Sequence, residues 1–345
     1  MADLRPVASL AQVATVTELW RFPVKSMGGH RVEVMGIDRR GPHADRLWAV
    51  RDVENDITAS ARKIPALLGF SARYVTEPGP DAGPGNAPEV VITFPDGSEC
   101  SSADPAVHGR IAELIGRDVR LVALPPRQDT SQHRLSMRQS MANFSADEVR
   151  RDFGLDKTEA LPDTSMFTTK QLLTVARFAT PPGTFVDLGP VHLLSTASLA
   201  SLPPDGDEPY DVRRFRPNVL VDSKVDQGEP DSDFPEAHWV GADVEIGSVT
   251  MRVTIPTIRC VVPTRPQPDL PLDRQLTRQL ATRTDRFLGV YADVTRPGLL
   301  RVGDVVSVRP ARAPGAGRRA AAAAGRAATR RVQRLLESTI LRGKG

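Results

Sequence analysis

Cysteine, aromatic residues and long apolar runs are all scarce in this chain. Its 345 residues include only two cysteines, Cys100 and Cys260, so the sequence excludes a disulfide framework. Aromatic residues make up 5% of the chain, and no stretch approaches the roughly 18 uninterrupted apolar residues of a membrane-spanning helix. The N-terminus also lacks a convincing signal-peptide pattern. We therefore expect a cytoplasmic protein with no transmembrane segment.

Several common catalytic motifs are also missing. The sequence contains no G-x-G-x-x-G, no G-x-x-x-x-G-K-[ST], no G-x-S-x-G, no H-E-x-x-H and no C-x-x-C. These patterns are typical of nucleotide-binding proteins, serine hydrolases, metalloproteases and thiol redox proteins. The six histidines never form a close pair, so we expect no zinc site made from neighbouring residues. His192 alternates with apolar residues in a predicted strand, which favours a buried or rim histidine.

Positive charge is concentrated at the C-terminal end. Residues 312–345 contain nine basic residues and one acid, a charge of +8, and the whole chain carries +3, so the remainder carries −5. The tail is rich in alanine, which favours a helix from about 319 to 341. It is predicted to be a solubilising, disordered or helical extension. Weak contact with nucleic acid or an anionic surface is the alternative.

Thirty prolines and 26 glycines divide the rest into short elements. The N-terminal half predicts a sheet meander, a hairpin turning at "PDG", a helix with buried Val107, Ile111, Leu114 and Ile115, and a closing strand. The predicted strands cover 13–20, 31–38 and 46–52, the hairpin 90–100, the helix 104–116 and the closing strand 118–124.

The C-terminal half is also rich in strands. A strand followed by a helix is expected over 187–202, a short helix near 145–153, and another helix over 271–285. Further strands are expected over 218–223, 239–247, 249–256, 289–294 and 299–308. Strands and helices do not alternate regularly, which argues against a doubly wound parallel sheet. The pattern predicts an α+β, β-rich and barrel-like fold.

Cys260 is the first candidate for a functional residue. It follows Arg259 inside "TIRCVVPTRPQ", 257–267. A thiolate is a soft metal ligand, and a nearby arginine would lower the pKa of its thiol. Strand alternation, however, would place Arg259 and Cys260 on opposite faces. A buried cysteine acting as a small apolar side chain is the structural alternative.

Cationic and amide side chains gather in three other stretches. Lys25 and Ser26 lie in the loop "FPVKSMGG", 22–29, and Arg46 lies at the start of a predicted strand. Arg216 and Asn218 flank a proline in "RRFRPN". The guanidinium of the arginine is suited to bind an anion, and the amide of the asparagine is suited to bind the edge of a heterocycle. Each could instead be an ordinary surface residue.

Ser195 stands where a predicted strand gives way to a helix. Such a serine commonly caps the helix. The same position could bring helix N–H groups to a phosphate.

Taken together, these stretches resemble the MOSC superfamily, named for the domain at the C-terminus of molybdenum cofactor sulfurases. The resemblance rests on "FPVKS", "DRLWAV", "DLGPVHLLSTASLASL", "RFRPN", "IRC" and "LLRVGDVV", and it extends over about residues 13–308. Its two-part layout is similar to that of the amidoxime-reducing components and their bacterial relatives. It implies two β-barrel-like domains: a MOSC N-terminal β-barrel domain at 13–124, a connecting segment at 125–164, a MOSC domain at 165–308, and the basic tail at 309–345.

The resemblance also implies a function. It implies a molybdenum cofactor (molybdopterin) whose metal takes Cys260 as its protein ligand, and a cofactor held by Lys25, Ser26, Arg46, Arg216 and Asn218. Asp187 would lie near the substrate. The implied activity is the reduction of N-hydroxylated or other N–O compounds.

Electrons would come from a separate redox protein, because no cysteine follows Cys260 to hold an iron–sulfur cluster. The residues after Cys260, "VVPTRPQPD", keep Thr264 but depart from the family pattern beyond it, which leaves the substrate open.

Two other functions stay open. The protein could carry sulfur or the cofactor on Cys260 without catalysing a reaction. It could instead be a structural module that acts through its basic tail, in which case replacing Cys260 would change nothing.

Overall fold

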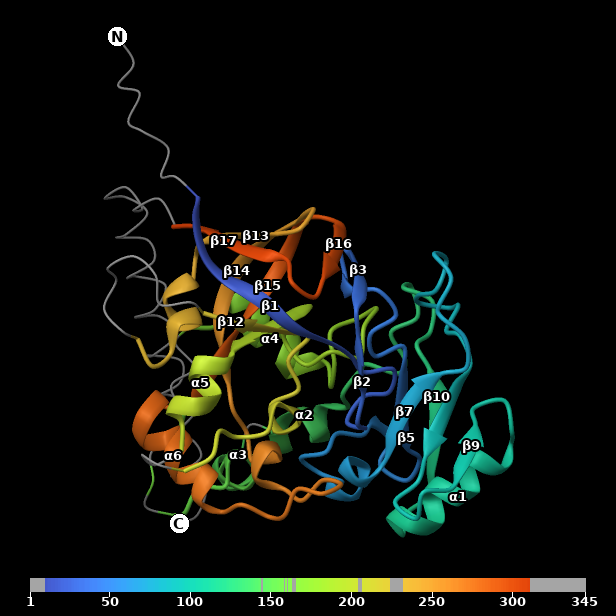
Figure 1. Ribbon diagram of the computed structural model, residues 1–345. Helices are drawn as coiled ribbons and strands as arrows, with labels where there is room; N and C mark the ends of the chain where they lie inside the picture. Colours follow the sequence, from blue (N-terminus) through green and yellow to red (C-terminus); the bar gives the residue numbers. More distant parts are fainter. Residues whose placement is uncertain are drawn as a thin grey trace.

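A closed seven-stranded barrel forms the larger part of the protein. The computed structural model describes residues 10–143, 145–157, 159, 161–162, 166–203, 207–223 and 232–310. Neighbouring barrel strands follow the order β1-β12-β11-β15-β14-β13-β17, and β17 pairs with β1 again (Figure 1). Only the β11–β12 pair is parallel among these described pairs. The barrel strands are β1 (Ala11–Arg21), β11 (Val191–Ser195), β12 (Val219–Asp222), β13 (Asp243–Ile246), β14 (Val249–Ile258), β15 (Phe287–Arg296) and β17 (Val305–Arg309).

Alternation along the strands fills the barrel. In β14 every second residue from Val249 to Thr257 is buried, as expected where side chains point alternately to the two faces. Val249, Met251 and Val253 belong to the barrel's apolar core. Thr257 is the last inward position of this series, at the end of the barrel where a pocket opens.

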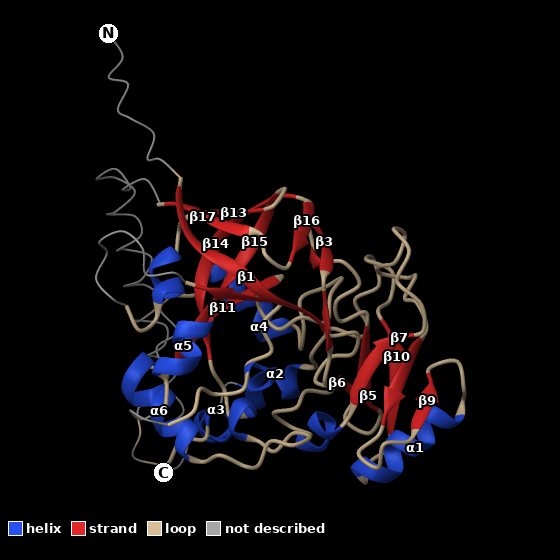
Figure 2. Ribbon diagram, viewed as in Figure 1, coloured by secondary structure: helices blue, strands red, loops and turns tan. Residues whose placement is uncertain are grey.

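Three small sheets accompany the barrel. Their strand orders are β10-β5-β6, β7-β8-β9 and β16-β3-β4 (Figure 2). The short strand β2 (His30–Val32) extends the barrel sheet beside β1 (Figure 1). The remaining strands are β3 (Val34–Asp38), β4 (Gly41–Pro42), β5 (Trp48–Asp52), β6 (Ile57–Thr58), β7 (Ser71–Tyr74), β8 (Val90–Thr93), β9 (Glu99–Ser101), β10 (Val119–Ala123) and β16 (Gly298–Arg301).

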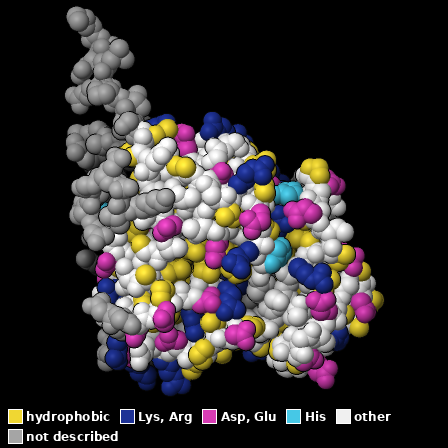
Figure 3. Space-filling view, in the orientation of Figure 1, with side chains coloured by type: hydrophobic (Ala, Val, Ile, Leu, Met, Phe, Trp, Pro, Cys, Tyr) yellow, Lys and Arg dark blue, Asp and Glu magenta, His cyan; other side chains and the backbone are white. Residues whose placement is uncertain are grey.

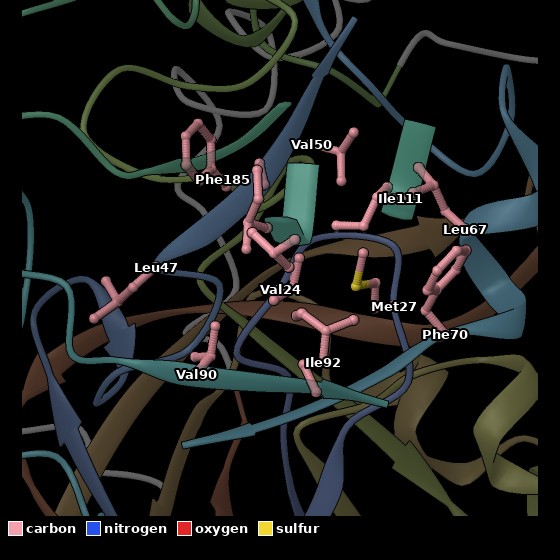
Figure 4. Close-up of a cluster of buried hydrophobic side chains, with 14 of the residues drawn as sticks. Val24, Met27, Leu47, Val50, Leu67, Phe70, Val90, Ile92, Ile111 and Phe185 are labelled. Atoms are coloured by element: carbon pink, nitrogen blue, oxygen red, sulfur yellow. The ribbon is translucent and has the colours of Figure 1, made fainter. Parts of the chain in front are cut away.

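The loop after β1 ties two of these sheets together. Val24 forms a bridge with Trp48 at the start of β5, and Gly28 forms one with Ser71 at the start of β7. The side chains of Val24 and Met27 point into the apolar cluster between the sheets, where Phe185 also lies (Figure 4). Because both are fully buried, they fix the two residues between them, Lys25 and Ser26, in place.

Helices cover the ends and the connecting segment. The α-helices are α1 (Ala106–Ile115), α2 (Met137–Asn143), α3 (Ala146–Phe153), α4 (Thr169–Arg177), α5 (Thr196–Ser201) and α6 (Gln275–Thr284). The 3-10 helices are η1 (Pro65–Gly69), η2 (Val212–Arg214), η3 (Pro235–Trp239) and η4 (Val262–Thr264). Within the described residues, no helix has the length and apolar character needed to cross a membrane.

The predicted α+β, β-rich fold class is confirmed. The predicted meander of the first three strands holds only in its first step. β2, at the start of the predicted strand 31–38, pairs with β1, but β3 lies in another sheet and β5 pairs with β10 and β6. Leu114 was expected on the buried face of α1 but is 53% exposed, so Val107 and Ile111 alone anchor the helix fully.

The domain boundaries stay predictions, and sheet pairing crosses them. β1, within predicted domain 13–124, pairs with β12 and β17, and β3 pairs with β16. The predicted tail helix lies outside the described residues.

Candidate active site

A pocket opens between the end of the barrel and the smaller sheets, and it gathers almost all of the predicted site residues. Seven of the eight line it: Lys25, Ser26, Arg46, Asp187, Arg216, Asn218 and Cys260. They come from chain segments up to 235 positions apart, so folding alone brings them together. On the face of the molecule seen in Figure 3, basic, acidic and histidine side chains lie among one another between the barrel and the smaller sheets.

The loop after β1 presents Lys25 and Ser26. The backbone N–H of Lys25 donates to Trp48 O at 2.8 Å. Its Nζ donates to Phe185 O at 3.1 Å and to Asp187. The hydroxyl of Ser26 accepts a hydrogen bond from the backbone N–H of Ala61 at 2.9 Å. Both side chains therefore have fixed positions at the pocket wall.

Asp45 is a buried carboxylate behind the pocket that the sequence analysis did not identify. It accepts hydrogen bonds from the backbone N–H of Phe22 at 2.7 Å and from Asn218 Nδ2 at 3.2 Å. It also forms an ion pair with Arg46, whose side chain is 13% exposed. Asp45 thus orients one amide and one guanidinium of the predicted cofactor-binding set.

Three pocket residues have backbone φ angles in the left-handed region. The angles are 69° for Ser26, 53° for Arg46 and 56° for Arg216. Only eight non-glycine residues in the described part of the chain have a positive φ. Such conformations cost about 1–3 kcal/mol each and gather at functional sites, where surrounding structure enforces them. Their concentration here marks the pocket as a site of function.

Arg216 forms no ion pair with any of the described residues. Its guanidinium lies over the ring of Phe22, 4.3 Å from the centroid, and Arg46 approaches the same ring at 4.9 Å. Its Nη2 is buried and has no hydrogen-bond partner among the described residues. Burial, followed by repulsion from Arg46, lowers its pKa to about 9. An unpaired buried donor is costly, so this group is suited to an anion that enters the pocket.

Arg259 and His192 form a rigid wall. Arg259 donates to Leu288 O at 2.8 Å, to Phe215 O at 3.1 Å and to His192 Nε2 at 2.6 Å. Since Nε2 accepts, the imidazole carries its proton on Nδ1, which faces Arg216 O at 3.3 Å. Burial and then Arg259 lower the pKa of His192 well below its usual value, so it remains neutral.

Gly289 makes this contact possible. A Cβ there would lie 2.6 Å from His192 Nε2, and its φ is +76°.

Cys260 lies just beyond the end of β14, in the pocket wall and partly exposed. The predicted separation of Arg259 and Cys260 onto opposite faces is wrong, because the strand ends at Ile258 and both residues line the pocket. Burial raises the pKa of the Cys260 thiol, and the strongest opposing charge is that of Arg62. Arg62, rather than Arg259, is therefore the arginine that most favours the thiolate.

Cys260 is also isolated from other ligands. No group of three or more His, Cys, Asp or Glu residues that could hold a metal ion occurs within the described residues. A metal bound at Cys260 would therefore have one protein ligand, and its remaining ligands would have to come from a cofactor.

Asp187 lines the pocket, with its side chain 64% exposed. Partial desolvation inside the pocket would raise the pKa of Asp187, but the charges of Lys25 and Arg62 hold it well below its usual value, so the group is a carboxylate at neutral pH. Burial lowers the pKa of Lys25, and Asp187 offsets part of that shift. Tyr291 lies nearby, where burial and then Asp187 raise its pKa to about 12.

Ser195 does not line the pocket. Its side chain is fully buried, and its hydroxyl accepts from Ser198 N at 3.0 Å and donates to Glu236 Oε2 at 2.6 Å. Ser195 therefore caps α5, which was one of its two predicted roles, the other being a contact with a phosphate. Ser198 also donates to Glu236 at 2.7 Å, so the buried carboxylate fastens η3 to the start of α5.

Three pocket features escaped the sequence analysis. Asp45 directly precedes Arg46 in "ADRLW", a stretch from which only the arginine was predicted as a site residue. Arg62 stands in "SARKIP", an unremarked polar stretch. Thr257 has a buried, unpartnered Oγ1 on the pocket lining, and nothing in its sequence context distinguishes it from a strand threonine.

Comparison with known proteins gives two family matches. The model of the MOSC N-terminal beta barrel domain matches residues 13–103, and that of the MOSC domain matches 182–307. Mitochondrial amidoxime reducing component 2 of Bos taurus is 27% identical over 86% of this chain and 84% of its own. The human protein of the same name is 28% identical with the same coverage. The crystal structure of the YUAD protein from Bacillus subtilis aligns with 88% of this chain and all of its own, with 12% identity and a TM-score of 0.41.

Proposed function

Because the chain belongs to the MOSC domain family, with a MOSC N-terminal beta barrel domain before its MOSC domain, we propose that it is a molybdenum-cofactor oxidoreductase that reduces N-hydroxylated or related N–O compounds. The pocket carries the proposal, because it combines a single soft ligand, Cys260, with a cationic donor, Arg216 Nη2, that has no hydrogen-bond partner among the described residues. The names of the amidoxime-reducing relatives supply the substrate class.

The residues present fit such a cofactor. Arg216 Nη2 and Thr257 Oγ1 are buried pocket atoms with no partner in the described part of the chain, so they are free to bind a ligand. Arg46 and Arg216 would hold the phosphate, since both are cations at one end of the pocket beside Phe22. Lys25, Ser26 and Asn218 would contact the pterin, and Cys260 would be the protein ligand of the metal.

The cofactor, when bound, supplies the two-electron redox chemistry, while the protein orients and stabilises. Reduction of an amidoxime consumes two electrons and two protons, breaks the N–O bond, and gives an amidine and water. The amidine is a strong base and becomes a cation. Asp187, a carboxylate exposed to the pocket, would accept hydrogen bonds from the substrate nitrogens and stabilise that positive charge. Lys25 fixes the orientation of Asp187.

The electrons would come from a separate redox protein. The described residues hold no further metal cluster, and no cysteine follows Cys260 in the sequence. The proposal therefore includes a partner that delivers electrons to this pocket. The cytoplasmic location stays a prediction.

The test is reduction of benzamidoxime by protein produced in a host with intact cofactor synthesis, with reduced methyl viologen as electron donor. The proposal predicts formation of benzamidine, and Asp187→Asn should lower kcat by about tenfold or more through loss of charge stabilisation. A loaded protein that forms no product but passes its cofactor or sulfur to an acceptor would support the carrier function instead.

A further inference from the structure

The pocket carries far more positive than negative charge. Among the described residues, its lining has a single carboxylate, Asp187, and six cationic side chains: Lys25, Arg46, Arg62, Arg214, Arg216 and Arg259. An excess of this size within one cavity favours anionic ligands. A single cofactor phosphate would account for only part of it.

Most of these cations are already engaged. Lys25 is paired with Asp187, and Arg46 with Asp45. Arg214 donates to Pro263 O at 3.0 Å and to Pro271 O at 2.9 Å, so it braces the loop beyond Cys260. Arg259 uses four of its five N–H donors on backbone carbonyls and His192, and Arg216 is the candidate for the phosphate.

Arg62 differs from the others in its exposure. Its side chain is 38% exposed, compared with 5% for Lys25 and 13% for Arg46. Its guanidinium makes one hydrogen bond within the described residues, from Nη1 to Asp152 Oδ2 at 3.1 Å. An arginine has five N–H donors, so Arg62 has several left for a planar anion such as a carboxylate.

Arg62 also lies where a substrate would enter. It lines the same pocket as Cys260 and Asp187. Cys260 is partly exposed and Asp187 is 64% exposed, so the open side of the pocket offers a cation and a carboxylate close to the same thiol. This pair is complementary to a ligand that carries charges of both signs.

The position of Arg62 is well defined. Asp152, at the end of α3, binds Arg62 through its carboxylate and accepts the backbone N–H of Val261 at 2.8 Å through its carbonyl. The residue next to Cys260 and the guanidinium of Arg62 are therefore attached to one residue of the connecting segment. Lys63 shares this anchor, because its Nζ lies 3.0 Å from Asp152 Oδ1 and it also pairs with Glu148.

We propose that Arg62 is a specificity-determining residue that binds a carboxylate on the substrate, so that the protein prefers N-hydroxylated amidine-type compounds that also bear a carboxylate. The carboxylate would form charge-assisted hydrogen bonds with Arg62 while the amidine end faces Asp187. This inference rests on the proposed function, since it names the substrate class of the same pocket.

The test compares two substrates that differ by one carboxylate, benzamidoxime and 4-carboxybenzamidoxime, with the holoenzyme and reduced methyl viologen. Wild type should favour the carboxylated compound by about tenfold in kcat/KM, mainly through KM, the effect of a charged hydrogen bond. Arg62→Gln should abolish this preference, so that the two substrates have about the same kcat/KM, and it should retain the molybdenum content. Lys63→Gln is the matched control: it weakens the same anchor on α3 from outside the pocket and should keep the preference.

Three results would overturn the inference. In the first, Arg62→Gln lowers activity on both substrates equally or lowers the molybdenum content, which would make Arg62 a cofactor-binding residue. In the second, Lys63→Gln removes the preference as fully as Arg62→Gln, which would make the role one of anchoring α3. In the third, wild type has no preference.

Binding of the products, benzamidine and 4-carboxybenzamidine, by calorimetry separates this inference from the proposed function. It requires no turnover. If neither substrate is reduced but the carboxylated product still binds more tightly in an Arg62-dependent manner, the proposed reaction fails while the role of Arg62 stands. Equal binding of the two products would contradict that role.

Discussion

Asn218 Nδ2 donates to Asp45 Oδ2 across 3.2 Å, although 173 positions separate the two residues in sequence. Asp45 lies just before β5 of the smaller sheets, and Asn218 lies just before β12 of the barrel. Their contact joins the two parts of the molecule behind the pocket. The pocket is therefore a property of the assembled chain, and its residues depend on the packing of one part against the other.

Loss of the Asp45 carboxylate should destabilise this junction. Asp45→Ala removes three interactions at once and leaves the guanidinium of Arg46 buried without its counter-ion. Breaking a buried ion pair in this way costs about 3–5 kcal/mol. Chemical denaturation of the cofactor-free protein measures the change in the free energy of unfolding.

Asp38→Ala is the matched control for Asp45. Asp38 also pairs with an arginine close in sequence, Arg40, but both side chains are about one third exposed. A surface pair of this kind contributes about 0–1 kcal/mol. Equal losses in the two variants would mean that Asp45 is no more than a surface charge.

Arg216→Met should separate stability from cofactor binding. The substitution removes a buried guanidinium whose Nη2 has no partner in the described part of the chain, and it also removes the contact with Phe22. These effects oppose each other, so the free energy of unfolding of the cofactor-free protein should change by less than about 1 kcal/mol. Cofactor content after purification should fall severalfold.

Arg213→Met provides the comparison. Arg213 lies on η2 outside the pocket and pairs with Asp211. It should retain its cofactor. A similar loss in both variants would argue against a phosphate at Arg216.

Ser195→Ala should affect folding and leave cofactor content unchanged. The hydroxyl caps α5 and donates to Glu236, so its loss leaves the N–H of Ser198 without its acceptor and removes one of the two hydroxyl donors of the buried carboxylate. We expect a decrease of about 1–3 kcal/mol in the free energy of unfolding. A loss of cofactor from protein that remains fully folded would restore Ser195 to the cofactor-binding set.

His133 should make the protein sensitive to acid. It is fully buried, its Nδ1 bonds Thr180 Oγ1 at 2.8 Å, and its Nε2 accepts from Gly183 N at 3.3 Å. Burial lowers its pKa to about 4; the charge of Asp129 offsets part of this shift, and the weaker effect of Arg51 adds to it. The unfolded chain, with a histidine pKa near 6.5, therefore takes up the proton first as pH falls.

Stability from this residue is therefore complete above about pH 6.5 and is lost progressively down to about pH 4, by an amount on the order of 3 kcal/mol. Urea denaturation between these pH values, for wild type and His133→Gln, measures it. Glutamine does not titrate, so the variant should lose less stability over this interval. Parallel pH profiles would show that His133 titrates normally in the folded protein.

Local patterns were sufficient to predict much of the fold. The hairpin at 90–100 forms with its turn at Pro95–Gly97, and the predicted strand and helix over 187–202 become β11 and α5. These depend on turn residues and alternation, which are properties of neighbouring residues. The pairing of the strands was harder to predict from the sequence, because β1 closes the barrel with β12 and β17, which are far away in sequence.

In the candidate site, too, some residues could be predicted from their local sequence and others could not. Cys260, Arg216 and Asn218 stand in unusual local sequence, and the structure brings them into one pocket. Arg62 and Asp45 acquire their importance only from what faces them after folding. Arg62 faces a thiol 198 positions away, and Asp45 faces an amide 173 positions away. A single sequence gives no sign of such contacts.

We propose Cys260 as the one protein ligand of a molybdenum cofactor. Elemental analysis of purified wild type and Cys260→Ala, both produced with intact cofactor synthesis, tests this role. We expect about one molybdenum per folded wild-type chain and a clear loss of metal, or altered metal coordination, in Cys260→Ala, because the described residues contain no group of three or more His, Cys, Asp or Glu residues that could hold the metal instead. Absence of molybdenum from both proteins, each properly folded, would contradict it and leave Cys260 as a core residue or a sulfur carrier.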